Sequence, residues 1–80
     1  MMKIQIQYFA MLAERRGLTE EWLTVETPDL AALYDALARQ HGFPVPRGSI
    51  RPAVNDAFRA WDHRLRDGDR VVFVPPVSGG

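Results

Sequence analysis

The last seven residues, VPPVSGG, offer the clearest chemistry in the sequence. Pro75 and Pro76 fix φ and lack a backbone N–H, so strand pairing weakens there and the chain favours an extended exit. Gly79 and Gly80 add no side chain, so this end can pass through a channel only as wide as a backbone. The group delivered at the end is the α-carboxylate of Gly80. We therefore expect residues 75–80 to form a flexible tail that presents this carboxylate to a partner.

A carboxylate with a pKa of about 3.5 is ionised at neutral pH and is a poor electrophile. It must be activated before it can carry cargo, and a mixed anhydride with AMP is the usual route. Attack by sulfide on that adenylate gives a thiocarboxylate, whereas attack by a lysine amine gives an isopeptide. The chain has no cysteine, so transferable sulfur would reside only at this terminus.

Other side chains offer little for catalysis. His41 and His63 are the only imidazoles, and neither lies in a zinc-binding pattern. Ser49 and Ser78 lack the context of an activated nucleophile, and the DGD at 67–69 is typical of a tight turn, not of a calcium loop. We expect no metal, no bound cofactor and no catalysis by this chain alone.

Composition sets the broad class. Eighty residues with 46% hydrophobic content predict one domain with a single small core. Ten basic and ten acidic residues give no basic footprint for nucleic acid or for a membrane surface. The absence of cysteine excludes disulfides and iron–sulfur clusters, and no apolar run suits a signal peptide or a membrane span. We expect a cytoplasmic domain.

Hydrophobic periodicity predicts the elements that position the tail. Alternation at Ile4–Tyr8 and at Glu21–Glu26 predicts two antiparallel strands, each with one buried face. Between them a short helix, Ala10–Arg16, ends at Gly17.

The strongest helix signal runs from Thr27 to Gly42. Thr27 is the expected N-cap, Pro28 suits the first helical position, and Gly42 ends the helix. Its apolar stripe consists of Leu30, Leu33, Tyr34 and Leu37.

The remaining elements follow from turn signals and alternation. They are a surface loop (43–48), a strand (50–55), a return strand (57–59), a helical turn carrying Trp61 and Leu65, a turn (67–69) and a last strand (70–74). This order favours an α+β fold of the ubiquitin-like β-grasp type, in which a mixed sheet packs on one main helix. The domain would span residues 1–74. A ferredoxin-like arrangement, the alternative, needs a second full helix.

Three segments carry a resemblance to a known family. LRDGDRVVFVPPVSGG (65–80) resembles the C-terminus of the small subunit of molybdopterin synthase. KIQIQYFAMLAERRG (3–17) is similar to the first strand, Phe-Ala turn and short helix of that family, and Ala53-Val54-Asn55 matches the residues before its hairpin. The chain departs from the pattern at Ala13, where many relatives have arginine, and at Asp56, where many have glycine.

The resemblance implies a function for the tail. In that family a ubiquitin-activating-like adenylyltransferase uses ATP to adenylate the C-terminal glycine, which then becomes a thiocarboxylate. The tail enters the large catalytic subunit, where its sulfur passes to cyclic pyranopterin monophosphate to form molybdopterin for the molybdenum cofactor. Gly80 would carry the sulfur and Gly79 would give clearance, in an assembly with two copies of each subunit. The residues implied to line the partner interface are Phe73, Val74, Pro75, Pro76, Val77 and Ser78.

Two other functions remain open on the sequence. Sulfur carriers for thiamine, cysteine or tRNA thiolation pathways share the fold and the Gly-Gly end but usually lack the Pro-Pro-Val run. A ubiquitin-like protein modifier would use the same activated terminus against lysines.

Overall fold

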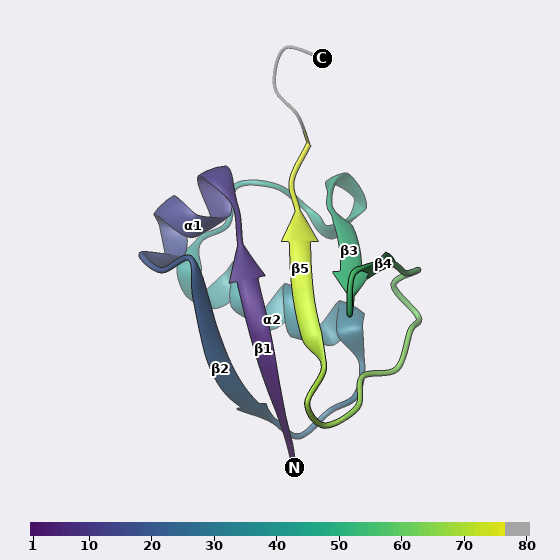
Figure 1. Cartoon of the computed structure of the whole chain (residues 1–80). Coiled ribbons are helices and arrows are strands. Elements are labelled where there is room, and N and C mark those ends of the chain that lie inside the picture. The colour runs from purple at the N-terminus through teal and green to yellow at the C-terminus, as the bar shows by residue number, and fades with distance from the viewer. Residues whose placement is uncertain (77–80) are drawn as a thin grey trace.

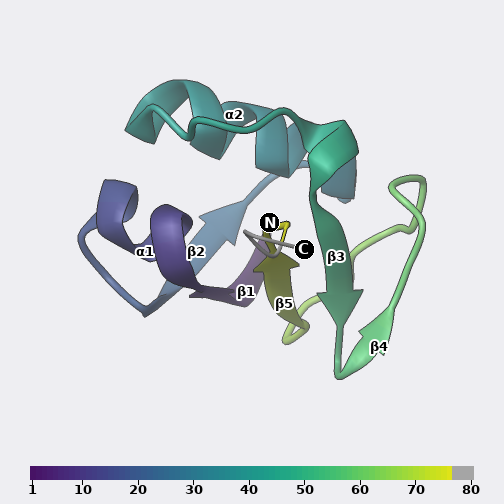
Figure 2. The ribbon, with the colours of Figure 1, turned by 90° about the horizontal axis from the view of Figure 1, so that it is seen from above.

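The computed structural model of the chain describes residues 1–76. Five strands form one sheet in the order β2-β1-β5-β3-β4, and the longer of two α-helices lies across one of its faces (Figures 1 and 2). In chain order the elements are β1 (Met2–Tyr8), α1 (Ala10–Arg16), β2 (Glu20–Val25), α2 (Leu30–His41), the 3-10 turn η1 (Arg47–Ser49), β3 (Arg51–Val54), β4 (Ala57–Phe58) and β5 (Arg70–Val74).

The sheet is mixed. β1 runs parallel to β5, while the pairs β1–β2, β3–β5 and β3–β4 are antiparallel. The predicted α+β fold of the β-grasp type is therefore confirmed, as is the antiparallel pairing of the first two strands. The ferredoxin-like alternative is wrong, because α1 has only seven residues and α2 is the one long helix of the described chain.

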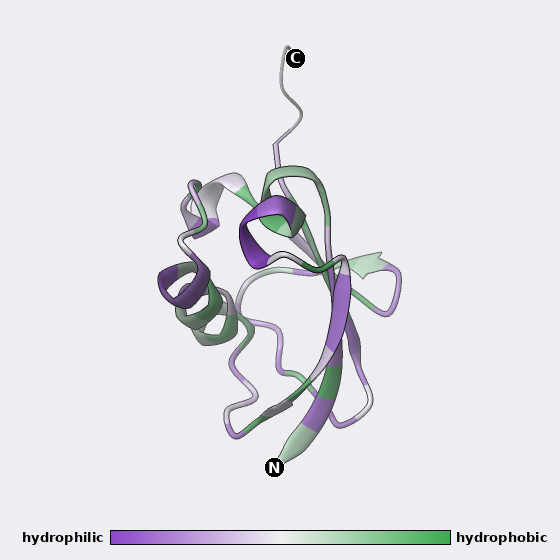
Figure 3. Cartoon of the chain, turned by 90° about the vertical axis from the view of Figure 1, so that its left-hand side faces the viewer, coloured by the Kyte–Doolittle hydropathy of each residue, from purple (hydrophilic) through white to green (hydrophobic). Residues whose placement is uncertain are grey.

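The core lies between α2 and the sheet. The predicted stripe on α2 is buried throughout, and it meets the inward residues of β1 and β5, among them Ile4, Ile6 and Val71. Figure 3 shows α2 on one side of the sheet, with apolar and polar residues alternating along the strands. Each fully buried aliphatic or aromatic side chain contributes about 1.5–3 kcal/mol to folding, so this single layer of contacts is the main source of stability.

The start of α2 differs from the prediction. The N-cap is Asp29, not Thr27: its carboxylate accepts hydrogen bonds from the backbone N–H groups of Ala31 at 3.0 Å and Ala32 at 3.3 Å. Pro28 precedes the cap and is not helical. Thr27 instead caps the turn before the helix, because its hydroxyl accepts a hydrogen bond from the N–H of Asp29 at 3.1 Å.

The segment between β4 and β5 also differs. Trp61 and Leu65 cover the core, but they lie on an irregular segment where a helical turn was expected. Backbone pairing explains this: the N–H of Leu65 donates to the carbonyl of Pro28 at 2.8 Å, and Arg64 forms an isolated bridge with Asp29. Those bonds extend the chain across the start of α2. A further difference is the 3-10 turn η1. It covers the last two residues of the predicted loop (43–48) and Ser49.

In the described residues no helix is long and apolar enough to cross a membrane.

Candidate functional site

The strand that leads into the tail, β5, is anchored along both of its edges. β5 pairs on both edges, with β1 and with β3. Its start is fixed by Asp69, only 8% exposed, whose carboxylate accepts hydrogen bonds from the side-chain amide of Asn55 at 2.9 Å and from the N–H of Arg66 at 2.8 Å. The carbonyl of Asp69 accepts from the N–H of Gln5 at 2.9 Å. The base of the tail therefore has a fixed position and direction.

Asn55 makes the hairpin between β3 and β4 part of this anchor. Asn55 and Asp56 both adopt left-handed conformations, with φ of 52° and 72°, as the predicted two-residue turn requires. The side-chain oxygen of Asn55 accepts a hydrogen bond from the N–H of Arg70 at 3.0 Å. This contact joins the turn to the first residue of β5 and compensates for the left-handed backbone.

The predicted DGD turn is present and ties β5 to β1. The carboxylate of Asp67 accepts a hydrogen bond from the N–H of Lys3 at 2.7 Å, and the N–H of Gly68 donates to the carbonyl of Lys3 at 2.7 Å. Gly68 has a φ of 86°, a conformation that glycine adopts without strain. In residues 1–76 no group of three potential metal ligands lies close enough to hold an ion.

At the other end of β5 the chain passes from the core to the surface within four residues. Phe73 is fully buried, Val74 is partly exposed, Pro75 is buried and Pro76 is exposed. The chain therefore reaches the surface at Pro76. Of the other predicted site residues, Val77, Ser78, Gly79 and Gly80 lie outside the described residues.

Phe73 and Pro75 are buried in this chain, although the family resemblance implies that both line the partner interface. The ring of Phe73 has 0% exposure and packs between Tyr34, at 5.1 Å between centroids, and Trp61, at 6.1 Å. Phe73 is a core contact of this chain, and it holds the strand that carries the tail. Val74 and Pro76 keep exposed surface and remain predicted contacts.

An exit surface surrounds the point where the chain emerges. Val74 pairs in register with Arg51 of β3, so the two side chains share the open face of the sheet. The guanidinium of Arg51 lies 4.0 Å from the ring centroid of Phe58, which is 55% exposed. We define the exit surface as Arg51, Phe58, Val74 and Pro76, together with exposed Phe9, which directly follows β1 at the same end of the sheet.

Phe9 and Phe58 were not identified from the sequence. The signal for Phe9 was the aromatic pair Tyr8-Phe9 at the end of an alternating strand, since only one of two adjacent residues can face the core. Phe58 is assigned only by the structure, through the pairing of its short strand. It lies opposite Ala53, on the face of the sheet that Val72 and Val74 share. In the sheet order Phe9, after β1, and Phe58, on β4, lie on opposite sides of β5, so the two exposed aromatic side chains flank the strand that leads into the tail.

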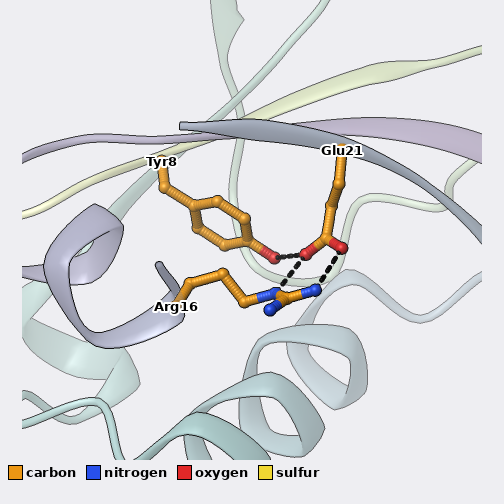
Figure 4. A network of polar contacts seen from close by, with 3 residues as sticks. All are labelled: Tyr8, Arg16 and Glu21. Atoms are coloured by element: carbon orange, nitrogen blue, oxygen red, sulfur yellow. Dashed lines mark hydrogen bonds and ion pairs between the residues drawn. The ribbon is translucent and has the colours of Figure 1, made fainter. Parts of the chain in front are cut away.

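A polar network fixes α1 beside the exit surface (Figure 4). The phenol of Tyr8 donates to Glu21 Oε2 at 2.7 Å, and Arg16 donates to both oxygens of the same carboxylate at 2.7 Å. Hydrogen bonding from Arg16 lowers the pKa of Glu21, and burial, with the adjacent carboxylate, raises the pKa of Tyr8. The network joins the end of β1, the end of α1 and the start of β2, so the backbone around Phe9 has little freedom.

This fold, in which the chain emerges from the central strand of a sheet that grips one helix, defines a small ubiquitin-like protein of the β-grasp class. The sequence model of the ThiS family matches residues 6–80. The chain belongs to the ThiS family.

The most informative relatives are these. The chain is 34% identical to the molybdopterin synthase sulfur carrier subunit of Escherichia coli, with 96% of this chain and 99% of that protein covered. It is 26% identical to one chain of a complex of subunits 1 and 2 of the molybdopterin-converting factor from Helicobacter pylori, with a TM-score of 0.69 and coverage of 99% and 100%. It is 25% identical to SAMP1 of Haloferax volcanii, with a TM-score of 0.78 and coverage of 98% and 99%.

Proposed function

We propose that this protein is the sulfur carrier subunit of a molybdopterin synthase. The observation that carries the proposal is the anchored strand β5, which brings the chain to the surface at Pro76, with the sequence Val-Ser-Gly-Gly following it. Identity over nearly the full length to a molybdopterin synthase sulfur carrier subunit supports it. The sequence motifs and this relative therefore indicate the same family and the same activity, that of a sulfur carrier for molybdopterin synthase.

The chemistry would take place at the carboxyl group of Gly80. One carboxylate oxygen attacks the α-phosphorus of ATP in a partner adenylyltransferase, which releases pyrophosphate and leaves an acyl adenylate. A sulfur donor then displaces AMP, so a C–S bond replaces the C–O bond and a thiocarboxylate forms. The chain itself supplies no acid or base: it supplies a fixed origin at Val74 and a proline pair that restricts the direction of the following residues.

The large catalytic subunit would bind the exit surface. A solved complex exists between subunits 1 and 2 of the Helicobacter pylori factor, and subunit 1 there shares this fold. Val74, Phe58 and Phe9 supply apolar area around the base of the tail, and Arg51 supplies the charge. An assembly with two copies of each subunit, located in the cytoplasm where ATP is available, completes the proposal.

Intact-mass spectrometry tests the proposed function. The chain is incubated with the adenylyltransferase of its own organism, ATP and a sulfur donor, and tandem spectra locate any change. We expect one oxygen to be replaced by one sulfur at Gly80, and we expect the product to yield molybdopterin when the large subunit and cyclic pyranopterin monophosphate are added.

The same experiment separates the competing functions. Thiocarboxylate that is inactive with the large subunit but active with a thiamine, cysteine or tRNA thiolation acceptor would assign the chain to another sulfur pathway. A ladder of lysine conjugates without thiocarboxylate would instead assign the chain to the ubiquitin-like protein modifiers. SAMP1 of Haloferax volcanii is a structural neighbour of this chain.

A further inference from the structure

Basic side chains gather on the segment that joins β4 to β5. Arg59, His63, Arg64 and Arg66 all lie on it, and together they line one surface cleft of about 630 Å³. That volume is in the usual range of ligand sites, about 300–1,000 Å³. Among residues 1–76 none of these three arginines has a carboxylate within ion-pair distance. The proposed function uses none of the four residues.

The backbone beneath the exposed arginines has a fixed position. The N–H of Leu65 donates to the carbonyl of Pro28 at 2.8 Å, and the N–H of Arg66 donates to the carboxylate of Asp69 at 2.8 Å. Leu65 is only 3% exposed and packs in the core, whereas its neighbours Arg64 and Arg66 are exposed. Two guanidinium groups are therefore presented to solvent from a backbone that is already ordered.

The floor of the cleft is apolar. Val54 and Leu65 line it and are 2% and 3% exposed, and Pro28 from the start of α2 lines it as well. The buried members form the floor and the exposed basic side chains form the rim. A ligand in the cleft would therefore meet carbon at the floor and positive charge at the rim.

The surroundings favour a carboxylate ligand over a phosphate. Phosphate sites commonly use the free N–H groups of a helix N-terminus, but at the start of α2 the carboxylate of Asp29 already accepts from Ala31 and Ala32. Nucleic-acid binding depends on an excess of basic charge, and this chain carries ten acidic residues against ten basic ones. Arginine, by contrast, binds a carboxylate through two parallel N–H···O bonds.

The cleft lies toward the end of the sheet opposite to the exit surface. Val54, in the floor, pairs with Val71 near the start of β5, whereas Arg51 of the exit surface pairs with Val74 at its end. Three residues of strand, about 10 Å, separate the two positions. Figure 1 shows the segment after β4 passing to the start of β5, away from the end where the chain emerges. A partner in the cleft therefore need not cover the base of the tail.

We propose that this cleft binds an acidic segment of a partner protein, in which neighbouring carboxylates flank an apolar side chain. Arg64 and Arg66 pair with the carboxylates, and Val54 and Leu65 contact the apolar side chain. The inference goes beyond the proposed function and does not depend on it, because it involves no residue of the tail and no step of the sulfur chemistry.

NMR titration of the isotope-labelled full chain tests the ligand chemistry. The probe is a short peptide in which glutamates flank a leucine, and the matched probe has glutamine in place of each glutamate. We expect the glutamate peptide to shift the backbone amides of Asn55, Arg64, Leu65 and Arg66, and the glutamine peptide to shift them little. Added salt should weaken the binding, because exposed charges are screened.

Two double variants test the site. Arg64→Gln with Arg66→Gln removes two charges from the cleft and keeps the N–H that residue 66 donates to Asp69. Arg15→Gln with Arg39→Gln removes the same charge from the last turns of α1 and α2, where both arginines are exposed. Melting curves establish that both variants are folded. We expect the first variant to bind the glutamate peptide about tenfold more weakly, as the loss of two exposed ion pairs implies, and the second to stay within about twofold of the natural chain.

Several results would overturn the inference. If the glutamate peptide shifts the cleft amides no more than the glutamine peptide does, or shifts only amides around Val74, the cleft is not an acidic-peptide site. Equal weakening in the two double variants would show a general effect of net charge. If inorganic phosphate or a single-stranded RNA shifts the same amides at lower concentration than the peptide, the ligand is a phosphate group. None of these results bears on sulfur loading, which the mass measurement tests separately.

Discussion

Tyr8 of β1 and Phe73 of β5 are register partners in the parallel strand pair, and each is fixed from a different side. Tyr8 donates to Glu21 within a three-residue polar network, while Phe73 packs its ring against Tyr34 and Trp61. Together these contacts hold the end of the sheet from which the tail emerges. The site is therefore rigid up to Val74, although the chemistry belongs to residues beyond it.

Phe73→Ala should destabilise the domain. Removing a fully buried ring from an aromatic cluster leaves a cavity, and the cost of such changes is about 3–5 kcal/mol. Urea denaturation followed by tryptophan fluorescence measures it, since Trp61 reports on the same cluster. Val74→Ala is the matched control, because Val74 is partly exposed, and it should cost about 1 kcal/mol or less. Equal losses for both variants would contradict the assignment of Phe73 to the core.

How far the sequence predicts this structure depends on the segment. The alternation in β1 fits only the two-residue period of a strand, and the apolar stripe on α2 fits only the 3.6-residue period of a helix. Each pattern therefore determines which residues face the core. The apolar run Val71-Val72-Phe73-Val74 carries no such alternation, so the buried members could not be separated from the exposed ones. Only the pairing of Phe73 with Tyr8, a contact between residues far apart in the sequence, assigns the two faces.

The cap of α2 and the exit surface were missed for related reasons. Thr27 and Asp29 are both good N-caps, and the tie between Leu65 and Pro28, which no local pattern contains, holds the chain extended up to Asp29. Phe58 lies on a strand of two residues, too short for alternation to be visible. What the sequence predicted well was the family, because the tail motif that indicates it depends on residue types and not on a fold.

The network of Tyr8, Arg16 and Glu21 should make stability depend on pH in the acid range. Hydrogen bonding from Arg16 holds the pKa of Glu21 below its ordinary value. The stability contributed by its carboxylate is therefore fully present above the pKa of the unfolded chain, about 4.3, and is lost as the pH falls through the lower folded pKa. Urea midpoints measured from about pH 7 down to pH 2 should fall in that window.

Glu21→Gln is the variant that isolates this contribution. It should cost about 2–3 kcal/mol at neutral pH, because two charge-assisted hydrogen bonds to Arg16 are lost. Below the folded pKa of Glu21 the variant and the natural chain should converge. A constant difference between the two chains at every pH would show that the charge of Glu21 does not contribute.

Phe58→Ala should weaken binding of the large catalytic subunit without unfolding the domain. Trp22 provides the matched control, since its exposure of 56% is close to the 55% of Phe58, but it lies on the edge strand β2, in register with Gln5. An aromatic anchor in an interface typically contributes about 1–2 kcal/mol or more, which is roughly a 5- to 30-fold change in Kd. Isothermal titration should show that loss for Phe58→Ala and little change for Trp22→Ala.

Deleting Gly80 separates the function of the tail from the stability of the fold. The last strand ends at Val74 and the described chain reaches the surface at Pro76, so removal of the final residue should leave the melting temperature unchanged. Sulfur transfer should nevertheless be abolished. One residue of extended chain spans about 3.3–3.6 Å, and reacting atoms must approach to about 3–3.5 Å in the correct orientation, so a carboxylate drawn back by one residue cannot reach the site.

An alanine added after Gly80 should fail for the opposite reason, by overfilling the same channel. The measurements are a melting curve and a molybdopterin-forming assay for each chain, with Trp22→Ala, which keeps the length and lies on the edge strand β2 outside the exit surface, as the control that should retain transfer. Full transfer by the shortened chain would show that reach does not limit the reaction, and the tail would then need another explanation.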